Sequence, residues 1–261
     1  MDKMTAPCPG KPAAYPGFSG SLLKRIAVVS MVLDHVGSFV TRGVYAPYMK
    51  DGYMYFSDRL PLYVRVFARI NPFLEALGML AIPIFCFLLA EGFVHTRSPL
   101  KYALRLGIFA LLSEAPYDLA HFGKFCDFKL QNVMFTLLVC LLTLIAMDFA
   151  RKRFSGGKPK TAAAYILCWA AGCGLVYLIK AEYVFLAVTS VSLFYLLRQN
   201  RFFRLSGVAP LIVASPWALL SAAPILLYNG ERGTGSKYFF YIFYPAHYLA
   251  IWAIAKYFAS L

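Results

Sequence analysis

The residues best suited to chemistry lie on one apolar segment near the start of the chain. Residues 21–41 are apolar enough to cross a bilayer, yet they contain the adjacent pair Asp34 and His35. Ionisable side chains are costly to place in hydrocarbon, so they usually mark a functional site there. An imidazole accepts a proton near neutral pH, and a nearby carboxylate raises its basicity. His35 is therefore a candidate general base, with Asp34 as a candidate partner.

Lys24 precedes His35 by eleven positions on the same predicted helix. At about 100° per residue the two side chains share one face, about 16 Å apart along the helix axis. We expect Lys24 at the headgroups and His35 deeper in the bilayer. Lys24 alone could be a topology anchor, and His35 could be a hydrogen-bonded packing residue. Adjacent positions on a helix point about 100° apart, so Asp34 need not touch His35.

A basic stretch follows the second apolar segment. Arg97, Lys101 and Arg105 are spaced by four, which places Lys101 and Arg105 on one helical face. Such a face at a membrane surface binds anionic lipid headgroups or the phosphates of a cofactor. Glu91 and His95 precede this basic stretch. The simpler interpretation of the Glu91 carboxylate is an ion pair with Arg105.

Polar groups also recur within or beside the later apolar segments. Ser113, Glu114 and Asp118 belong to a proline-interrupted polar stretch, which is tolerated in a membrane only where protein or a wet cavity surrounds it. Glu114 is therefore a strong cavity candidate. Interhelical hydrogen bonding and ordinary packing are the alternatives for the rest. The further candidates for this cavity are Asn132, Glu182, Tyr183, Asn229, Tyr244 and His247.

The composition places these residues in a polytopic membrane protein. Hydrophobic residues make up 60% of the 261 positions and charged residues only 15%, with a mean hydropathy of +0.62. A net charge of +14 would suggest nucleic acid binding in a soluble chain. Here the basic residues lie between apolar blocks, where they orient helices, so we expect no nucleic acid partner. The six cysteines indicate neither a disulfide framework nor a metal site.

About eight apolar segments are long enough to span a bilayer, which needs roughly 20 residues. They are 21–41, 73–95, 100–120, 131–150, 161–179, 182–198, 206–227 and 238–258. No strand alternation is sustained, so we expect an all-α bundle of transmembrane helices. Lys and Arg are more frequent on the side of the N-terminus when eight spans are assumed, which predicts an N-in/C-in orientation.

The remaining segments are assigned by composition. Residues 1–20 are predicted to form a disordered tail ahead of a single transmembrane domain over residues 21–261. The connection from Arg42 to Asn71 is long and rich in tyrosine, which is typical of lids, binding loops or interfacial helices. Residues 60–70 within it are a candidate amphipathic helix on the membrane surface.

Short motifs along nearly the whole chain resemble the TraX family of conjugal-transfer and fimbrial-assembly membrane proteins. They occur in the family's order, and one departure is Glu182-Tyr183-Val184, where the family is expected to have an acidic residue, Tyr and Gly. The spacing of Lys24 and His35 is also similar to a pattern on the first span of the acyltransferase-three membrane enzymes. The matching stretches include Asp34-His35-Val36-Gly37, Pro83-Ile84-Phe85-Cys86-Phe87, His95-Thr96-Arg97, Ser113-Glu114-Ala115-Pro116-Tyr117-Asp118, Gln131-Asn132-Val133-Met134 and Tyr244-Pro245-Ala246-His247.

The resemblance implies an acyltransferase in the bacterial inner membrane. It would move an acetyl or other acyl group from cytoplasmic acyl-CoA to an amine or hydroxyl outside, which is a pilin N-terminus in the family's known case. A cell-surface glycan is another possible acceptor, and no metal is implied. The acetyl-CoA phosphates would be held by Arg97, Lys101, Arg105 and Lys24.

In this hypothesis His35 is the base, oriented by Asp34 or Glu114. A transient acyl-histidine remains open, and the candidate oxyanion donors are Asn132, Ser113 and Tyr244. Two other classes of function also remain open. A proton-coupled transporter would place Asp, Glu and His in its spans, and a non-catalytic pilus-assembly protein could use the same groups for packing.

Overall fold

The fold is known from a computed structural model that describes residues 17–50, 53–54, 60–154, 156–235 and 237–260. Most of the predicted N-terminal tail lies outside the described residues. The described chain is helical apart from two-residue strands, β1 (Met49–Lys50) and β2 (Tyr53–Met54), which pair antiparallel. The predicted all-α class is confirmed.

The segment that carries His35 is a helix with a local change of pitch. Helix α1 (Gly20–His35) begins at Ser19, whose hydroxyl accepts a hydrogen bond from the Leu22 amide. A π-helical turn (Val36–Val40) follows His35 directly and leads into α2 (Thr41–Tyr45) and a 3₁₀ turn (Ala46–Tyr48). Such turns occur frequently at functional sites.

The long connection predicted before the second span is partly helical. Helix α3 (Leu62–Gly78) runs antiparallel to α1 and the π-helical turn. Two contacts show this direction: the Thr41 hydroxyl donates to the Asn71 side chain at 3.0 Å, and Gly78, later in α3, lies against Asp34, earlier in the chain than Thr41. A two-residue break separates α3 from α4 (Ala81–His95). The candidate surface helix is thus the first half of α3, and the predicted span 73–95 is divided between two helices.

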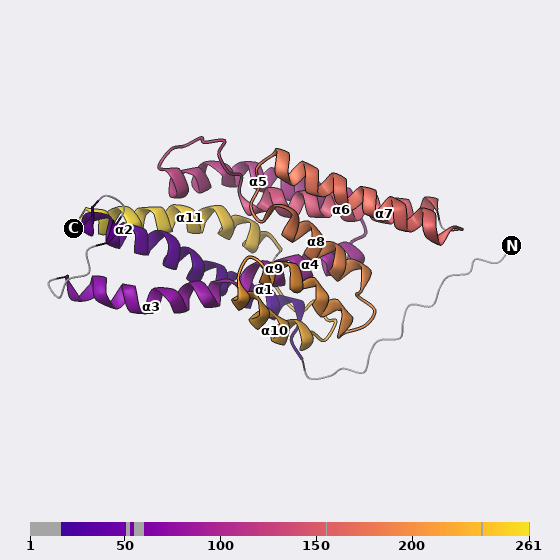
Figure 1. The fold of residues 1–261 in the computed structure, drawn as a ribbon, viewed down its shortest axis with the longest axis horizontal. Helices are drawn as coiled ribbons and strands as arrows, with labels where there is room; N and C mark the ends of the chain where they lie inside the picture. Colours follow the sequence, from indigo (N-terminus) through magenta and orange to yellow (C-terminus); the bar gives the residue numbers. More distant parts are fainter. Residues whose placement is uncertain (1–16, 51–52, 55–59, 155, 236, 261) are drawn as a thin grey trace.

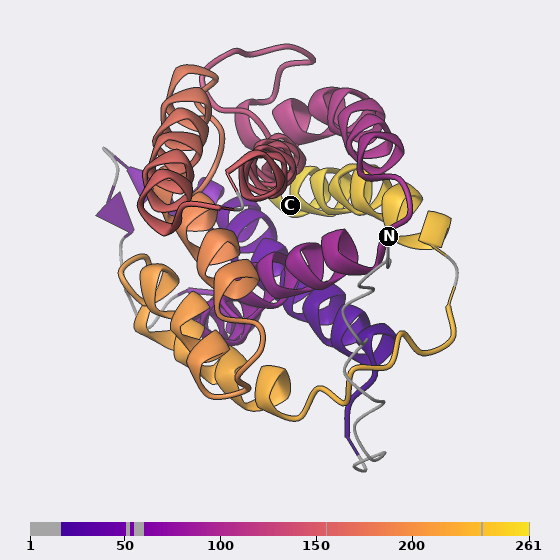
Figure 2. The same ribbon diagram turned by 90° about the vertical axis from the view of Figure 1, so that its right-hand side faces the viewer.

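Four helices follow in sequence, and each packs against the next (Figures 1 and 2). Proline begins α5 (Pro99–Phe122), where its missing N–H costs nothing. The Asn132 side chain caps α6 (Val133–Arg153) by accepting from the Met134 amide at 3.0 Å. Helices α7 (Lys158–Leu178) and α8 (Val184–Leu196) complete the group.

The predicted seventh span, 206–227, is not one helix. It consists of a 3₁₀ turn (Phe203–Gly207), α9 (Ala209–Ile212), a second 3₁₀ turn (Pro216–Ser221) and α10 (Ala222–Leu226). Pro210, Pro216 and Pro224 prevent a continuous hydrogen-bond ladder. The segment also returns to its starting point, since Arg201 donates to the Leu226 carbonyl oxygen at 3.4 Å. We call this segment, 203–226, the broken hairpin.

Because of the broken hairpin, α11 (Lys237–Ala259) runs parallel to α1 and α2. Lys24 lies 5.6 Å from the Phe240 ring, His35 contacts His247, and Gly43 lies against Ala255. The end of α11 therefore lies beside α2, on the side away from the beginning of α1 (Figure 1). The predicted N-in/C-in arrangement would require these helices to be antiparallel if both cross the membrane, so that orientation is not confirmed.

Three helical segments among the described residues are long and apolar enough to cross a membrane. They are Leu62–His95, Val133–Arg153 and Lys158–Leu178, and shorter apolar helices occur at Val184–Leu196 and Pro216–Leu226. Helices α1, α5 and α11, which carry His35, Glu114 and His247, are outside this set. Glu91 and His95 lie on α4, at the end of the first of the three segments.

Candidate active site

A single cavity of about 860 Å³ is lined by side chains from α1, α4, α5, α6 and α11 and by the turn before α8. Lys24 and His35 both line it, although they lie three helical turns apart on α1, so the cavity is elongated along that helix. One end is basic, and the other end contains His35. The volume is in the range of cavities that hold small molecules or cofactors.

At the end of the cavity opposite the basic end, two residues of α11 hold His35. Its Nδ1 lies 2.7 Å from His247 Nε2, and its Nε2 lies 3.3 Å from the Tyr248 hydroxyl. The Asp34 carboxylate is 4.0 Å from Nε2, which is an ion-pair distance and too long for a hydrogen bond. The adjacency of Asp34 and His35 in sequence therefore does not make Asp34 the hydrogen-bond partner of His35.

The turn before α8 brings Glu182 and Tyr183 to the same end of the cavity. The Tyr117 hydroxyl donates to the Glu182 carboxylate at 2.6 Å, and the Thr136 hydroxyl donates to its carbonyl oxygen at 2.6 Å. The backbone there is strained, with positive φ at Tyr183 (58°) and Val184 (33°). A β-branched residue rarely adopts this conformation, and such strain is typical of functional sites.

Glu114 and its neighbours lie behind the cavity wall. The Asn132 amide donates to the Glu114 carboxylate and to the Ala110 carbonyl oxygen, so Glu114 joins α5 to the start of α6. Ser113 donates to the Phe109 carbonyl oxygen of its own helix, and Asp118 accepts from the Asp127 amide. None of these predicted site residues lines the cavity. Glu114 thus bonds to Asn132, in the interhelical role that was the alternative interpretation, and not to His35.

The basic end is built from three separate parts of the chain. Arg232 reaches it because the Gly20 and Ser21 amides donate to the Glu231 and Arg232 carbonyl oxygens at 2.7 and 2.9 Å. Arg105 stacks over the Tyr102 ring at 5.7 Å. We call the lining cations the mouth cations: Lys24, Arg97, Arg105 and Arg232. Glu91 and His95 line the same end, with 3.9 Å between the Glu91 carboxylate and His95 Nδ1.

Two predicted residues are placed differently from expectation at this end. The Lys101 side chain is exposed and does not line the cavity. Asn229, predicted for the opposite side of the membrane, is half-buried near Gly17, whose carbonyl oxygen lies 3.5 Å from the Asn229 amide nitrogen. The broken hairpin explains the second error, because it returns the chain to the end where α1 begins.

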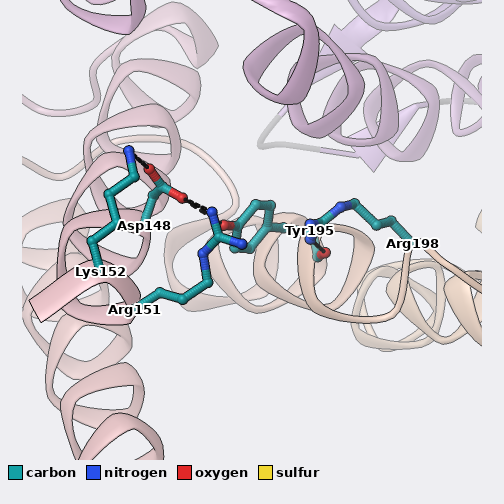
Figure 3. A network of polar contacts seen from close by, with 5 residues as sticks. All are labelled: Asp148, Arg151, Lys152, Tyr195 and Arg198. Atoms are coloured by element: carbon teal, nitrogen blue, oxygen red, sulfur yellow. Dashed lines mark hydrogen bonds and ion pairs between the residues drawn. The ribbon is translucent and has the colours of Figure 1, made fainter. Parts of the chain in front are cut away.

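A second group of cations lies around Asp148 (Figure 3). It is at the same end of the helices, because the Tyr195 ring packs against Phe93 of α4, with 5.6 Å between the ring centroids. The Asp148 carboxylate accepts from Arg151 and pairs with Lys152, both at 2.7 Å, and the Tyr195 hydroxyl donates to it at 3.3 Å. Arg198 donates to the Tyr195 carbonyl oxygen at 2.7 Å. No mouth cation forms an ion pair among the described residues. An uncompensated set of cations is suited to an anionic ligand such as a phosphate.

Sequence reasoning missed several lining residues. Tyr248 follows the candidate His247 directly, so its place beside His35 could have been considered. Arg232 was missed because residues 206–227 were interpreted as a crossing. Tyr102, Tyr228 and Tyr241 also line the cavity, and a tyrosine near a membrane surface gives no signal that separates a cavity from an interfacial belt.

Comparisons with known proteins cover nearly the whole length of the chain. Residues 19–255 match the family described as TraX protein. The chain is also 27% identical over 265 residues to the "Probable fimbrial assembly protein FimC, serogroup H1" of Dichelobacter nodosus, covering 92% of this chain and 97% of that protein. No solved structure matches the chain.

Proposed function

Because the chain belongs to the TraX family, we propose that it is a membrane acyltransferase that moves an acetyl or other acyl group from cytoplasmic acyl-CoA to an acceptor on the opposite side. One observation carries the proposal: a single cavity has unpaired cations at one end and His35 at the other. The relative named as a probable fimbrial assembly protein supports a pilin-like N-terminus as the acceptor.

We further propose that the bacterial inner membrane is crossed by α1, the α3–α4 pair, α5, α6, α7, α8 and α11, with the broken hairpin re-entrant. The beginning of α1 then faces the cytoplasm and the end of α11 faces outward. This arrangement moves Arg232 and Lys237 to the cytoplasmic side and removes only Lys256 from it. The excess of basic residues on that side therefore grows, as the positive-inside rule expects.

The mouth cations fit the phosphates of acetyl-CoA. A guanidinium presents two parallel N–H donors to a phosphate, and three of these four cations are arginines. The pantetheine arm has an extended length of roughly 15 Å by ordinary chain dimensions. Lys24 and His35 are separated by about 16 Å along α1. A donor held by its phosphates at the mouth would thus present its thioester to His35.

The chemistry that follows is acyl transfer assisted by a general base. His35 Nε2 takes the proton from the acceptor amine or hydroxyl, whose nitrogen or oxygen attacks the thioester carbonyl carbon. The carbon–sulfur bond then breaks, and the departing thiolate receives the proton from His35. Of the three candidate oxyanion donors, only Tyr244 lines the cavity. It is the remaining candidate for stabilising the tetrahedral intermediate.

A transfer assay tests this proposal. The purified protein in lipid nanodiscs receives acetyl-CoA with a labelled acetyl group and a peptide whose N-terminus is free. We expect labelled peptide from the wild-type protein and at least a hundredfold slower transfer from His35→Ala, within the range of general-base contributions. Absence of transfer together with absence of acyl-CoA binding would favour a non-catalytic assembly protein, the alternative that the relative's name supports.

A further inference from the structure

His247 lies behind His35 and outside the cavity, with contacts at both of its ring nitrogens. Its Nε2 is 2.7 Å from His35 Nδ1, and its Nδ1 is 3.3 Å from the Phe243 carbonyl oxygen. The two imidazole rings are nearly parallel, with 14° between their planes. His247 is 6% exposed and packs against the rings of Phe243 and Tyr248. The contacts form a line from a backbone carbonyl group to His35.

The direction of the hydrogen bonds along this line follows from the carbonyl group. The Phe243 oxygen only accepts, so the proton of neutral His247 is on Nδ1. His247 Nε2 then carries a lone pair and accepts, which requires His35 Nδ1 to donate. His35 Nε2 is consequently unprotonated, and it faces the Tyr248 hydroxyl, the Asp34 carboxylate and the cavity.

We propose that His247 is a positioning residue that holds His35 in the tautomer with a free Nε2 and stabilises the imidazolium formed when Nε2 takes a proton. The effect of His247 on catalysis rests on the proposed acyltransferase function, whereas its effect on the tautomer of His35 does not depend on that function. In hydrolases with a serine nucleophile, a carboxylate bonded to Nδ1 of the base has this role. Here neither predicted carboxylate is bonded to Nδ1, because Asp34 lies 4.0 Å from the other ring nitrogen, Nε2, and Glu114 accepts from Asn132.

The surroundings of His35 contain other ionisable groups, which the test must take into account. Asp34 precedes it on α1, Tyr248 and His247 belong to α11, and His121 of α5 packs against Phe39 and Tyr248. The groups on the remaining neighbouring elements are Glu75 on α3, Arg42 on α2, and Glu182 and Tyr183 before α8. Substitution of His247 leaves all of these in place.

The tautomer can be measured without any activity assay. The chain has only four histidines, so nitrogen-15 magnetic resonance of histidine-labelled protein, with His35→Asn for assignment, separates the protonated from the free nitrogen of His35. We expect a protonated Nδ1 and a free Nε2 in the wild type. We expect this preference to be lost in His247→Phe, which keeps a ring beside Phe243 and removes the acceptor. His247→Gln offers an amide oxygen and should restore it.

A pH–rate profile of the transfer reaction adds the catalytic readout. In His247→Phe we expect kcat to fall at least about tenfold, with KM for acetyl-CoA within twofold of the wild-type value. The acidic limb should move to lower pH, because His35 loses the acceptor that stabilises its imidazolium. His247→Gln should recover most of kcat. A lower kcat with an unmoved limb in His247→Phe would indicate a merely structural role and overturn the proposal.

The outcomes separate the two proposals. A wild-type His35 with its proton on Nε2 would overturn the role of His247 whatever the enzyme does. The expected tautomer in a protein that binds and transfers no acyl group would support the positioning by His247 and count against the proposed acyltransferase. If His247→Phe fails to fold, the wild-type spectrum and His247→Gln still decide the question.

Discussion

Two groups of cations at the same end of the molecule differ in how their charge is compensated. Around Asp148, one carboxylate binds both Arg151 and Lys152 (Figure 3). The mouth cations come from α1, the turn between α4 and α5, α5 and the loop after α10, and they form no ion pair among the described residues. The cations around Asp148 are neutralised within the protein and need no ligand. The mouth cations have no such partner, so they are suited to bind an anionic ligand.

The difference has a physical basis. Like charges held together near a low-dielectric cavity repel each other, and chains rarely retain such groups without a compensating partner. Partly exposed ion pairs such as those of Asp148 contribute little to stability, typically below about 1 kcal/mol each. Charge at the mouth should therefore affect binding, and charge around Asp148 should affect neither binding nor stability by much.

The largest effect is expected when two mouth cations are removed together. Each charge-assisted hydrogen bond to a phosphate is worth about 1.5–3 kcal/mol, so Lys24→Gln with Arg232→Gln should weaken acetyl-CoA binding at least about a hundredfold. Binding is measured by calorimetry with acetyl-CoA and, as a control, with acetyl-pantetheine, which lacks the nucleotide phosphates. Equal losses for both donors would show that the variant distorts the cavity and would contradict a phosphate site.

A substitution that narrows the cavity without changing its charge shows how cavity shape alone affects transfer and binding. A Cβ at Gly78 would overlap Asp34, where the end of α3 meets α1. Gly78→Ala should therefore destabilise the fold by about 1–3 kcal/mol, as overpacking does. It should also slow transfer more than it weakens the binding of free CoA. Thermal unfolding, the transfer rate and the affinity for free CoA are the measurements, and an unchanged unfolding temperature would mean that the helices do not approach so closely.

The matched test in the other group should give a much smaller result. Asp148→Asn removes the compensating charge, and we expect a loss of about 1 kcal/mol in the free energy of unfolding. The affinity for acetyl-CoA should stay within twofold of the wild-type value. Calorimetry under the same conditions measures this affinity. A tenfold loss in Asp148→Asn would show that the charge around Asp148 also affects acetyl-CoA binding, and would contradict the difference between the two groups of cations.

The smallest effect concerns the end of the cavity that contains His35. Val184 has a φ of 33°, a conformation that suits glycine. Val184→Gly should remove strain of about 1 kcal/mol or more, offset in part by the greater backbone freedom of glycine in the unfolded chain. We expect a net stabilisation below about 1 kcal/mol in denaturant unfolding, with the affinity at the mouth unchanged. Clear destabilisation would show that Val184 contributes packing that outweighs its strained backbone.

Much of this arrangement could be predicted from the sequence, and the failures share a cause. The all-α class, the position of His35 three turns from Lys24, and Arg97 and Arg105 at the basic end follow from hydropathy and helical periodicity. The broken hairpin has the same composition as a crossing helix, so hydropathy could not distinguish them. Interpreting the broken hairpin as a crossing placed Asn229 on the side opposite Gly17, and the N-in/C-in orientation that depends on this crossing is not confirmed.

The partners of His35 could not be predicted for a different reason. Sequence adjacency suggested Asp34, and the polar stretch around Glu114 suggested a second carboxylate. Contacts between helices depend on their rotation and on the direction in which they run. Only the packing of α11 against α2 and the π-helical turn, which follows His35, shows that His247 and Tyr248, 212 and 213 positions later in the chain, meet His35.

The central claim is that one cavity carries a donor from the mouth cations to His35. Photo-crosslinking with an acyl-CoA that bears a diazirine in its acyl group tests this most directly, because mass spectrometry locates the label without requiring transfer. We predict labels near His35 and on the peptide around Tyr244 and Tyr248, lost when Lys24 and Arg232 are both replaced by Gln. Labels confined to α7, which is largely exposed, or labelling that persists in that variant, would contradict the claim.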